Sequence, residues 1–247
     1  MKSLITLMAA ALMLFTSVPS VSAFYKGFAE DLHERQAEKE DYNETYHQIF
    51  LMLEAKDFGI ETEGKDNEQL AKEIAEAKIK QSAKEKGIET EGEDIKELAK
   101  EVHHAEVKEK AEEMGIKQKG KDPQMLAEEV YEAILKQKAD ELGVDKEGKK
   151  PEDLKNAVLE ASIKNEATTL GIDIEGKDFK ELRKAIHEQK TFKTAKALGI
   201  DDDDKNAEKL FDEIMTQYAE KAKEQKLYPF ENKEGKFFKG HHHLQTK

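Results

Sequence analysis

The sequence predicts an all-α protein in which tandem helical repeats of 28 residues form a solenoid or superhelix. Two observations support this fold. A Gly-Ile pair, once Gly-Val, recurs six times at a constant interval, and such regular spacing is typical of repeat architectures. The segments between these pairs are rich in helix-forming residues and carry apolar residues in matching positions. The paired glycines are Gly59, Gly87, Gly115, Gly143, Gly171 and Gly199.

Each unit is expected to contain one helix of about 20 residues, roughly 30 Å long, followed by a short loop. The stretch from Lys65 to Lys86 contains neither Gly nor Pro, and Pro123 and Pro151 stand only where a helix would begin. The first glycine of each pair suits the C-terminal end of a helix, where left-handed backbone is needed. Acidic residues after the second glycine suit the first helical turn.

The apolar positions change sides halfway along each predicted helix. At 100° per residue, Leu126 and Val130 share one face, whereas Leu135 and Ala139 lie on the opposite face. A helix in a simple bundle would keep a single apolar stripe. Two opposed half-stripes predict that each helix contributes to two small cores, one with each neighbour, as in a solenoid.

The N-terminus predicts export. Residues 1–23 have the pattern of a secretory signal peptide, with Lys2, an apolar run and small residues ending at Ala23. We expect cleavage after Ala23 and a secreted, extracellular protein. No other apolar stretch is long enough to cross a bilayer, so no stable membrane insertion is expected after cleavage.

The remaining chain divides into three predicted segments. Residues 24–58 are expected to form N-terminal capping helices, residues 59–226 the helical repeat array, and residues 227–247 a C-terminal tail or cap. Aromatic residues concentrate near both ends, where large rings would cover the exposed ends of an array. A terminal aromatic binding patch is the alternative. These residues are Phe24, Tyr25, Phe28, Tyr42, Tyr46, Phe50, Phe211, Tyr218, Tyr228, Phe230, Phe237 and Phe238.

Charge narrows the range of partners. The formal net charge is −13, and 38% of the residues are charged. An acidic chain repels phosphate backbones and anionic lipid, so we expect no nucleic-acid partner. The chain has no cysteine, which excludes disulfides.

One loop has the outline of a nucleotide-binding motif. In LGIDIEGKDFKEL, Gly171 is followed by Gly176 and Lys177. A phosphate-binding loop needs Ser or Thr after the lysine and a strand before the first glycine. Here Asp178 follows the lysine and a predicted helix precedes the loop. The sequence therefore predicts a connector between helices.

The same segment resembles the helix–extended loop–helix motif of the SAP and HeH families. The shared pattern is an apolar helix end, a glycine followed by a hydrophobic residue, a second glycine, a lysine and a leucine. It falls here on Leu170, Gly171, Ile172, Gly176, Lys177 and Leu182. The resemblance covers residues 55 to 214 in overlapping copies and implies the local fold. SAP modules resemble DNA binders and are normally basic, so the DNA-binding role is not carried over to this acidic chain.

No arrangement of residues indicates catalysis, because serines lack a histidine at matching spacing and the glutamates recur all round the helices. We therefore expect no enzyme and no cofactor. The expected function is binding or scaffolding outside the membrane, with an extracellular or cell-surface protein or a wall polymer as partner. One alternative is a secreted metal-ion-binding protein that uses acidic loops and the histidine tail, His241, His242 and His243. The other alternative is an enzyme of unknown class.

Overall fold

A computed structural model describes residues 42–231, and within this range the protein is all helical, without a strand. The helices follow one another along the chain and are joined by short loops. Their bounds are α2 Tyr42–Asp57, α3 Asn67–Glu85, α4 Ile95–Glu113, α5 Pro123–Glu141, α6 Pro151–Thr169, α7 Phe179–Leu198, α8 Ala207–Gln217 and α9 Ala219–Glu224. None of these helices is long and apolar enough to span a membrane. The predicted signal peptide lies outside the described residues.

The helix starts reproduce the spacing of the sequence. From α3 to α8 every helix begins 28 residues after the one before, and α3, α4, α5 and α6 each have 19 residues. The sixth unit differs, because its helix breaks at Tyr218 into α8 and α9. The break places Ala222 in the same hydrophobic cluster as Leu210 and Ile214 of α8.

Side chains at the N-terminal ends explain where most helices begin. The Asp66 carboxylate accepts a hydrogen bond from the Gln69 backbone amide at 2.8 Å, and the Gln69 side chain accepts in return from the Asp66 amide. This is a capping box, which satisfies two backbone donors that a helix start leaves unpaired. Asp178 and Glu181 form the same arrangement at α7.

The hydrophobic interior is divided into small clusters between consecutive helices. On α5, Leu126 and Val130 pack with residues of α4, whereas Leu135 and Ala139 pack with residues of α6. The other junctions between consecutive helices follow the same plan. The predicted change of apolar face along each helix is therefore confirmed, since each half of α5 is buried against a different neighbour.

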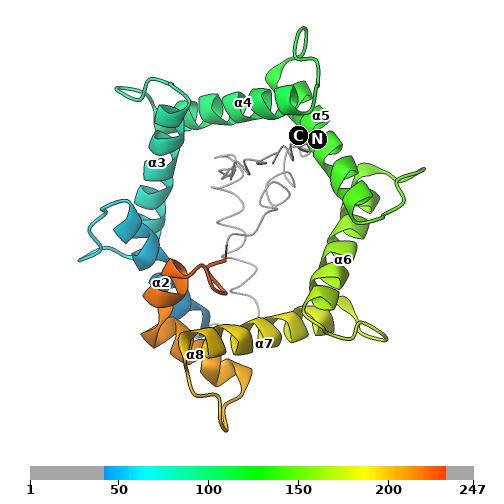
Figure 1. The fold of residues 1–247 in the computed structure, drawn as a ribbon. Helices are drawn as coiled ribbons and strands as arrows, with labels where there is room; N and C mark the ends of the chain where they lie inside the picture. Colours follow the sequence, from blue (N-terminus) through cyan, green and yellow to red (C-terminus); the bar gives the residue numbers. More distant parts are fainter. Residues whose placement is uncertain (1–41, 232–247) are drawn as a thin grey trace, which may run out of the picture.

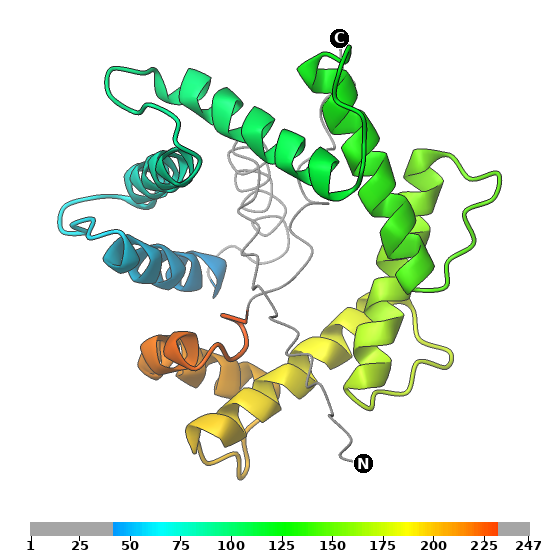
Figure 2. The same cartoon turned by 45° about the horizontal axis from the view of Figure 1, so that its top comes forward.

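The helices turn steadily in one direction, so that the last of them return to the first (Figure 1). The result is a closed ring in which α2 lies beside α8, and Figure 2 gives the same arrangement from a second direction. We call the contact of α2 with α8 and α9 the seam. The sequence predicts aromatic caps on two ends of an array. In the structure Tyr46 and Phe50 near the first end instead contact Phe211 and Phe230 near the last at the seam.

The seam differs chemically from the other junctions. None of the hydrophobic clusters among the described residues combines α2 with α8 or α9. In their place, the Tyr46 ring meets the Phe211 ring edge-on at 5.3 Å between centroids. Phe50 and Phe230 lie 4.9 Å apart by the same measure. Ring contacts of this geometry stabilise beyond the area that they bury.

Polar contacts complete the seam. The Lys223 ammonium donates to the Leu53 carbonyl oxygen at 2.6 Å and to the Asp57 carboxylate at 2.5 Å. Lys56 and Glu220 form an ion pair at 2.7 Å, and both of these side chains are exposed. Exposed ion pairs each contribute at most about 1 kcal/mol. The ring is therefore closed by aromatic and polar contacts in place of a shared hydrophobic cluster.

Candidate functional site

The loops between the helices begin with one recurring hydrogen-bond pattern. At the end of α3, the Gly87 amide donates to the Lys84 carbonyl at 3.1 Å, and the Ile88 amide donates to the Ala83 carbonyl at 2.9 Å. This is a Schellman motif, which requires left-handed backbone at the glycine. Gly87 has φ of 68°, and Ile88 packs against the cluster between α3 and α4. The motif explains why a glycine is followed by an apolar residue in every unit.

A second turn reverses the loop before the next helix. In the first loop the Lys65 amide donates to the Thr62 carbonyl at 3.3 Å, with Gly64 between them at φ of 76°. In the sixth loop Asp204 occupies the place of this glycine and has φ of 61°. A residue with a Cβ is strained in this conformation. The last loop therefore keeps the common shape with an unfavourable residue.

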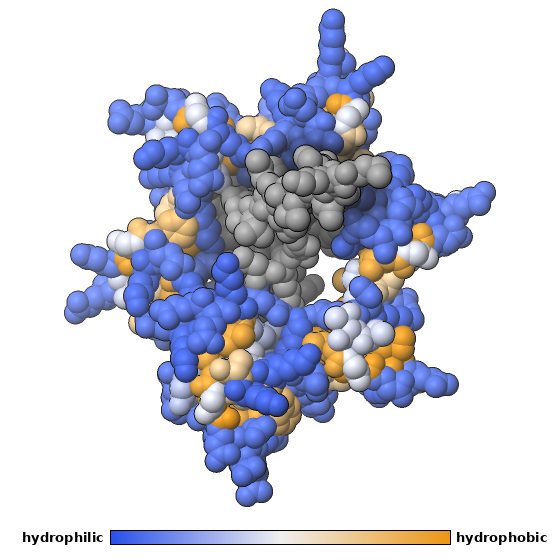
Figure 3. All heavy atoms as spheres, in the orientation of Figure 1, coloured by the Kyte–Doolittle hydropathy of each residue, from blue (hydrophilic) through white to orange (hydrophobic). Residues whose placement is uncertain are grey.

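These loops project from the outer corners of the ring (Figure 1). Hydrophilic residues occupy their outermost tips, and hydrophobic residues gather where neighbouring helices meet (Figure 3). We refer to the loops together as the loop ridge and number them in chain order. They are loop 1 (59–66), loop 2 (87–94), loop 3 (115–122), loop 4 (143–150), loop 5 (171–178) and loop 6 (199–206).

The six loops share a shape but differ in charge. Loop 2 contains four acidic residues and no basic one, whereas loop 3 contains three lysines and one aspartate. Loop 4 has three lysines against two acidic residues, and loops 1, 5 and 6 are acidic. The ridge therefore presents one backbone form with six different sets of charged side chains.

The loop that resembles a phosphate-binding motif is a connector. It leaves α6 through Gly171, and the Lys177 ammonium donates to the Asp173 carbonyl oxygen of the same loop at 2.7 Å. Asp178 caps α7. The lysine and the carboxylate thus both shape the loop, and the segment connects two helices.

The acidic loop 6 brings three carboxylates together. One oxygen from each of Asp201, Asp202 and Asp203 lies within 4.8 Å of the others, and all three residues are exposed. Asp201 also accepts a hydrogen bond from the Asp203 amide at 3.1 Å, which stabilises the turn. The predicted metal ligands His241, His242 and His243 lie outside the described residues.

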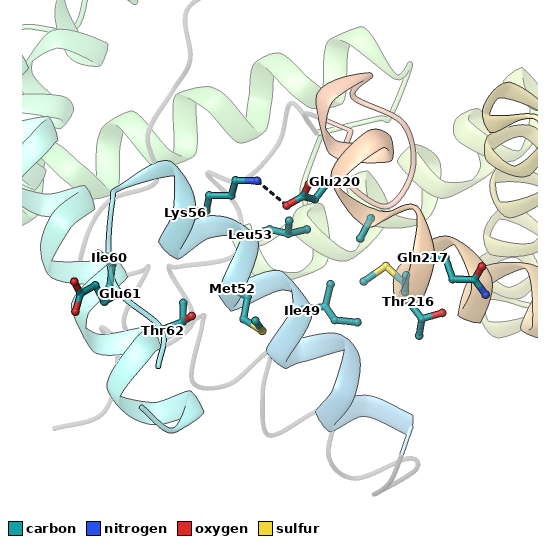
Figure 4. A pocket seen from close by; sticks show the side chains of 12 residues that line it. Ile49, Met52, Leu53, Lys56, Ile60, Glu61, Thr62, Thr216, Gln217 and Glu220 are labelled. Atoms are coloured by element: carbon teal, nitrogen blue, oxygen red, sulfur yellow. Dashed lines mark hydrogen bonds and ion pairs between the residues drawn. The ribbon is translucent and has the colours of Figure 1, made fainter. Parts of the chain in front are cut away.

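A hollow of about 610 Å³ lies in the seam (Figure 4). Ile49, Met52 and Leu53 of α2 line one side, and Thr216 and Gln217 lie on the other. Met52 is 45% exposed in this hollow. The hollow therefore lies between the first described helix and the end of α8.

Helix α4 carries a pair of half-buried titratable groups that no motif in the sequence indicates. Glu106 Oε1 and His103 Nδ1 are buried atoms that have no hydrogen-bond partner among the described residues. Burial raises the pKa of the Glu106 carboxyl to about 7, with a smaller opposing effect from Lys86. Burial also lowers the pKa of His103, and the neighbouring His104 lowers it further.

The repeat register contains a signal for this site. In the corresponding position of other units, Lys78 pairs with Glu54, and Lys190 pairs with Glu166. Glu106 stands in that position on α4, so a carboxylate replaces the lysine of those two units; the units between α4 and α7 have Ile134 and Ser162 there. Its raised pKa follows from burial without such a partner.

Comparison with family models, curated proteins and solved structures finds no match to this chain. The resemblance to SAP and HeH motifs therefore remains an expectation from the sequence pattern.

Proposed function

We propose that this protein is an exported scaffold, a solenoid closed into a ring, that binds its partners through the loop ridge. The observation that supports the proposal most is the repetition of one loop form around the rim of the ring. Each loop is held at its base by a Schellman motif, so it presents its side chains without a large loss of backbone freedom on binding. No enzyme activity is part of this proposal.

Repetition favours a partner that can engage several loops together. When several sites bind one extended partner, each further contact is intramolecular and overall affinity rises steeply. A cell-surface protein array or a wall polymer offers such repeated contacts. An isolated small molecule would gain nothing from six separated loops.

The test compares the mature protein with a variant in which exposed loop side chains are neutralised. Glu61, Glu91, Lys119, Glu147 and Glu175 would be replaced by serine, while the glycines and helix caps stay unchanged. We expect the mature protein to be retained by cell-wall or culture-supernatant fractions, and the variant to be retained at least about tenfold less. Equal retention of both proteins, or no retention of either, would refute the proposal.

Export is tested separately. We propose that secretion removes residues 1–23, so mass spectrometry of the protein from the culture medium should find Phe24 at the N-terminus. An intact Met1 on protein that remains inside the cell would refute this part.

The second candidate function is metal binding, which is favoured by the grouping of Asp201, Asp202 and Asp203 in loop 6. Calorimetric titration with Ca²⁺ would compare the protein with an Asp201→Asn, Asp202→Asn double variant. Titration with Zn²⁺ and Ni²⁺ would compare it with a form that lacks residues 240–247. Micromolar binding that these changes abolish supports metal binding over scaffolding, and unchanged heats refute it.

A further inference from the structure

Charge is ordered around the ring. Loops 3 and 4 are neighbours on the rim (Figure 1) and are net basic, at +2 and +1. The other loops follow one another around the remaining rim and are net acidic, at −2 for loop 1, −4 for loop 2, −2 for loop 5 and −3 for loop 6. Among the six loops of the described ring, loops 3 and 4 thus form one basic sector.

The lysines of this sector are available for binding. Lys117, Lys119, Lys149 and Lys150 are exposed, and none of them takes part in an ion pair within residues 42–231. Two other lysines of these loops are already neutralised inside the molecule, Lys121 by Glu129 and Lys146 by Asp140. The unpaired lysines are therefore the ones that a partner would meet.

The acidic sector provides carboxylates in an equivalent setting. Glu61, Glu63, Glu91 and Glu93 are exposed in loops 1 and 2 and form no ion pair among the described residues. Loops 1 and 2 stand at the two ends of α3, and loops 3 and 4 stand at the two ends of α5 (Figure 1).

The spacing of the two sectors matches. Helices α3 and α5 both have 19 residues. At 1.5 Å per residue, each therefore separates its pair of loops by about 28 Å. We call loops 3 and 4 together the basic edge, and loops 1 and 2 together the acidic edge; the positive charge of the basic edge lies on its loops, because α5 itself is net acidic. Two loops of one sign on one copy can meet two loops of the other sign on another copy at the same separation.

We propose that the basic edge of one ring binds the acidic edge of a second copy of the same chain. The proposal rests on the proposed function, because it takes the loop ridge as a binding surface, and it names one partner for that surface. Each contact joins two different edges, so one copy of a bound pair keeps a free acidic edge and the other keeps a free basic edge. A heterologous contact of this type extends into chains or larger closed rings of copies.

The net charge of −13 opposes association but does not prevent it. At about 0.15 M salt the screening length is about 8 Å, so charges on the far side of each ring contribute little. The facing loops lie within that length when the edges touch. Local attraction between lysines and glutamates therefore decides the contact at this ionic strength.

Sedimentation velocity of the mature protein over a hundredfold concentration range provides the test. We expect assemblies larger than a dimer to grow with concentration at about 0.15 M NaCl and to dissociate at about 1 M NaCl. The basic-edge variant carries Lys117→Glu, Lys119→Glu and Lys149→Glu. The acidic-edge variant carries Glu61→Lys, Glu63→Lys, Glu91→Lys and Glu93→Lys. Each variant alone should associate at least about tenfold more weakly.

The decisive measurement is made on a mixture of the two variants. In the basic-edge variant both edges are acidic, whereas in the acidic-edge variant both edges are neutral to basic, so the two variants attract each other. The mixture should recover association, which a misfolded variant would not do. A matched control, Asp173→Lys with Glu175→Lys in loop 5, should associate like the unchanged protein. A monomer at every concentration, or undiminished association of either edge variant, would overturn the proposal. A monomer that still loses retention when its loops are neutralised would leave the proposed function standing.

Discussion

The Tyr46 hydroxyl on α2 donates a hydrogen bond to the Asp212 carboxylate on α8 across 2.9 Å, although 166 positions separate the two residues. This contact joins the first and last parts of the described chain. Every other junction is made by consecutive helices around a hydrophobic cluster. The seam is therefore the place where the ring depends on contacts that are distant in sequence.

Substitution of Tyr46 should loosen α2 and α8 together. Tyr46→Phe removes the hydrogen bond but keeps the ring contact with Phe211, and should cost about 1 kcal/mol. Tyr46→Ala removes a side chain that is 8% exposed, and should cost about 3 kcal/mol. Hydrogen exchange should accelerate in both α2 and α8, whereas exchange in α5 serves as the internal control and should not change. Faster exchange in α2 alone would contradict the account of the seam.

Replacement of Asp204 by glycine should stabilise the protein. Asp204 has φ of 61°, a conformation that glycine adopts at the same place in the other five loops. The gain should be about 0.5 to 1 kcal/mol, since the left-handed penalty is removed. Gly176→Ala is the matched reverse change, because a Cβ there would meet nothing within 4 Å and only backbone strain is added. Thermal unfolding should shift upward for the first variant and downward for the second, and shifts of the same sign would be inconsistent with this explanation.

A side-chain cap at the N-terminal end of α6 should increase the stability of the protein. Lys150 has N-cap backbone angles but makes no side-chain capping bond, unlike Asp178 at α7. Lys150→Asp should stabilise the protein by about 1 kcal/mol, and Asp178→Ala should destabilise it by a similar amount. Lys150→Asn separates capping from charge, because it supplies an acceptor without a negative charge. If denaturant unfolding finds Asn no better than Lys, capping is not the limiting feature of this helix start.

Because of Glu106, the free energy of unfolding should fall as the pH rises. Its pKa is raised from 4.5 in the ordinary carboxyl to about 7 in the folded protein, so the folded state binds the proton more tightly than the unfolded state. The stabilisation is complete below about pH 4.5 and is lost as the pH rises through about 7, by at most about 3 kcal/mol. Glu106→Gln should remove this part of the pH dependence, whereas Glu112→Gln at an exposed position of α4 should not.

His103 acts in the opposite direction. Its pKa is lowered, so protonation in acid costs the folded state more than the unfolded state. The difference between the unchanged protein and the Glu106→Gln variant isolates the carboxyl from this opposing effect. If that difference in unfolding free energy stayed constant from pH 5 to pH 8, Glu106 would not be the responsible group.

The local structure could be read from the sequence because it depends on neighbouring residues. Gly87 and Ile88 predict the left-handed end of a helix, and Asp66 predicts a helix start. The positions of Leu126 and Leu135 predict two buried faces on one helix. Each of these features involves contacts within one unit or with the next. The interval between glycines then fixes where every helix begins.

Closure of the ring could not be read in the same way. Curvature depends on the small angle between successive helices, which side-chain packing sets and no single residue encodes. The concentration of aromatic residues near the two ends is evident in the sequence. Nothing in the sequence predicts that Tyr46 and Phe50 contact Phe211 and Phe230. The position of Glu106 differs between units, with lysine at 78 and 190 but Ile134 and Ser162 between them, so the sequence alone does not predict that the Glu106 carboxyl is buried without a cation.

The most direct test of the closed ring is a distance measurement across the seam. The chain has no cysteine, so spin labels can be attached at Glu63→Cys in loop 1 and Asp203→Cys in loop 6. Lys119→Cys and Glu147→Cys in loops 3 and 4 give the control pair, which α5 holds about 30 Å apart. We predict a narrow distribution for the seam pair, comparable in distance to the control. A seam distance beyond about 60 Å, two helix lengths, with an unchanged control would show an open array and contradict the ring.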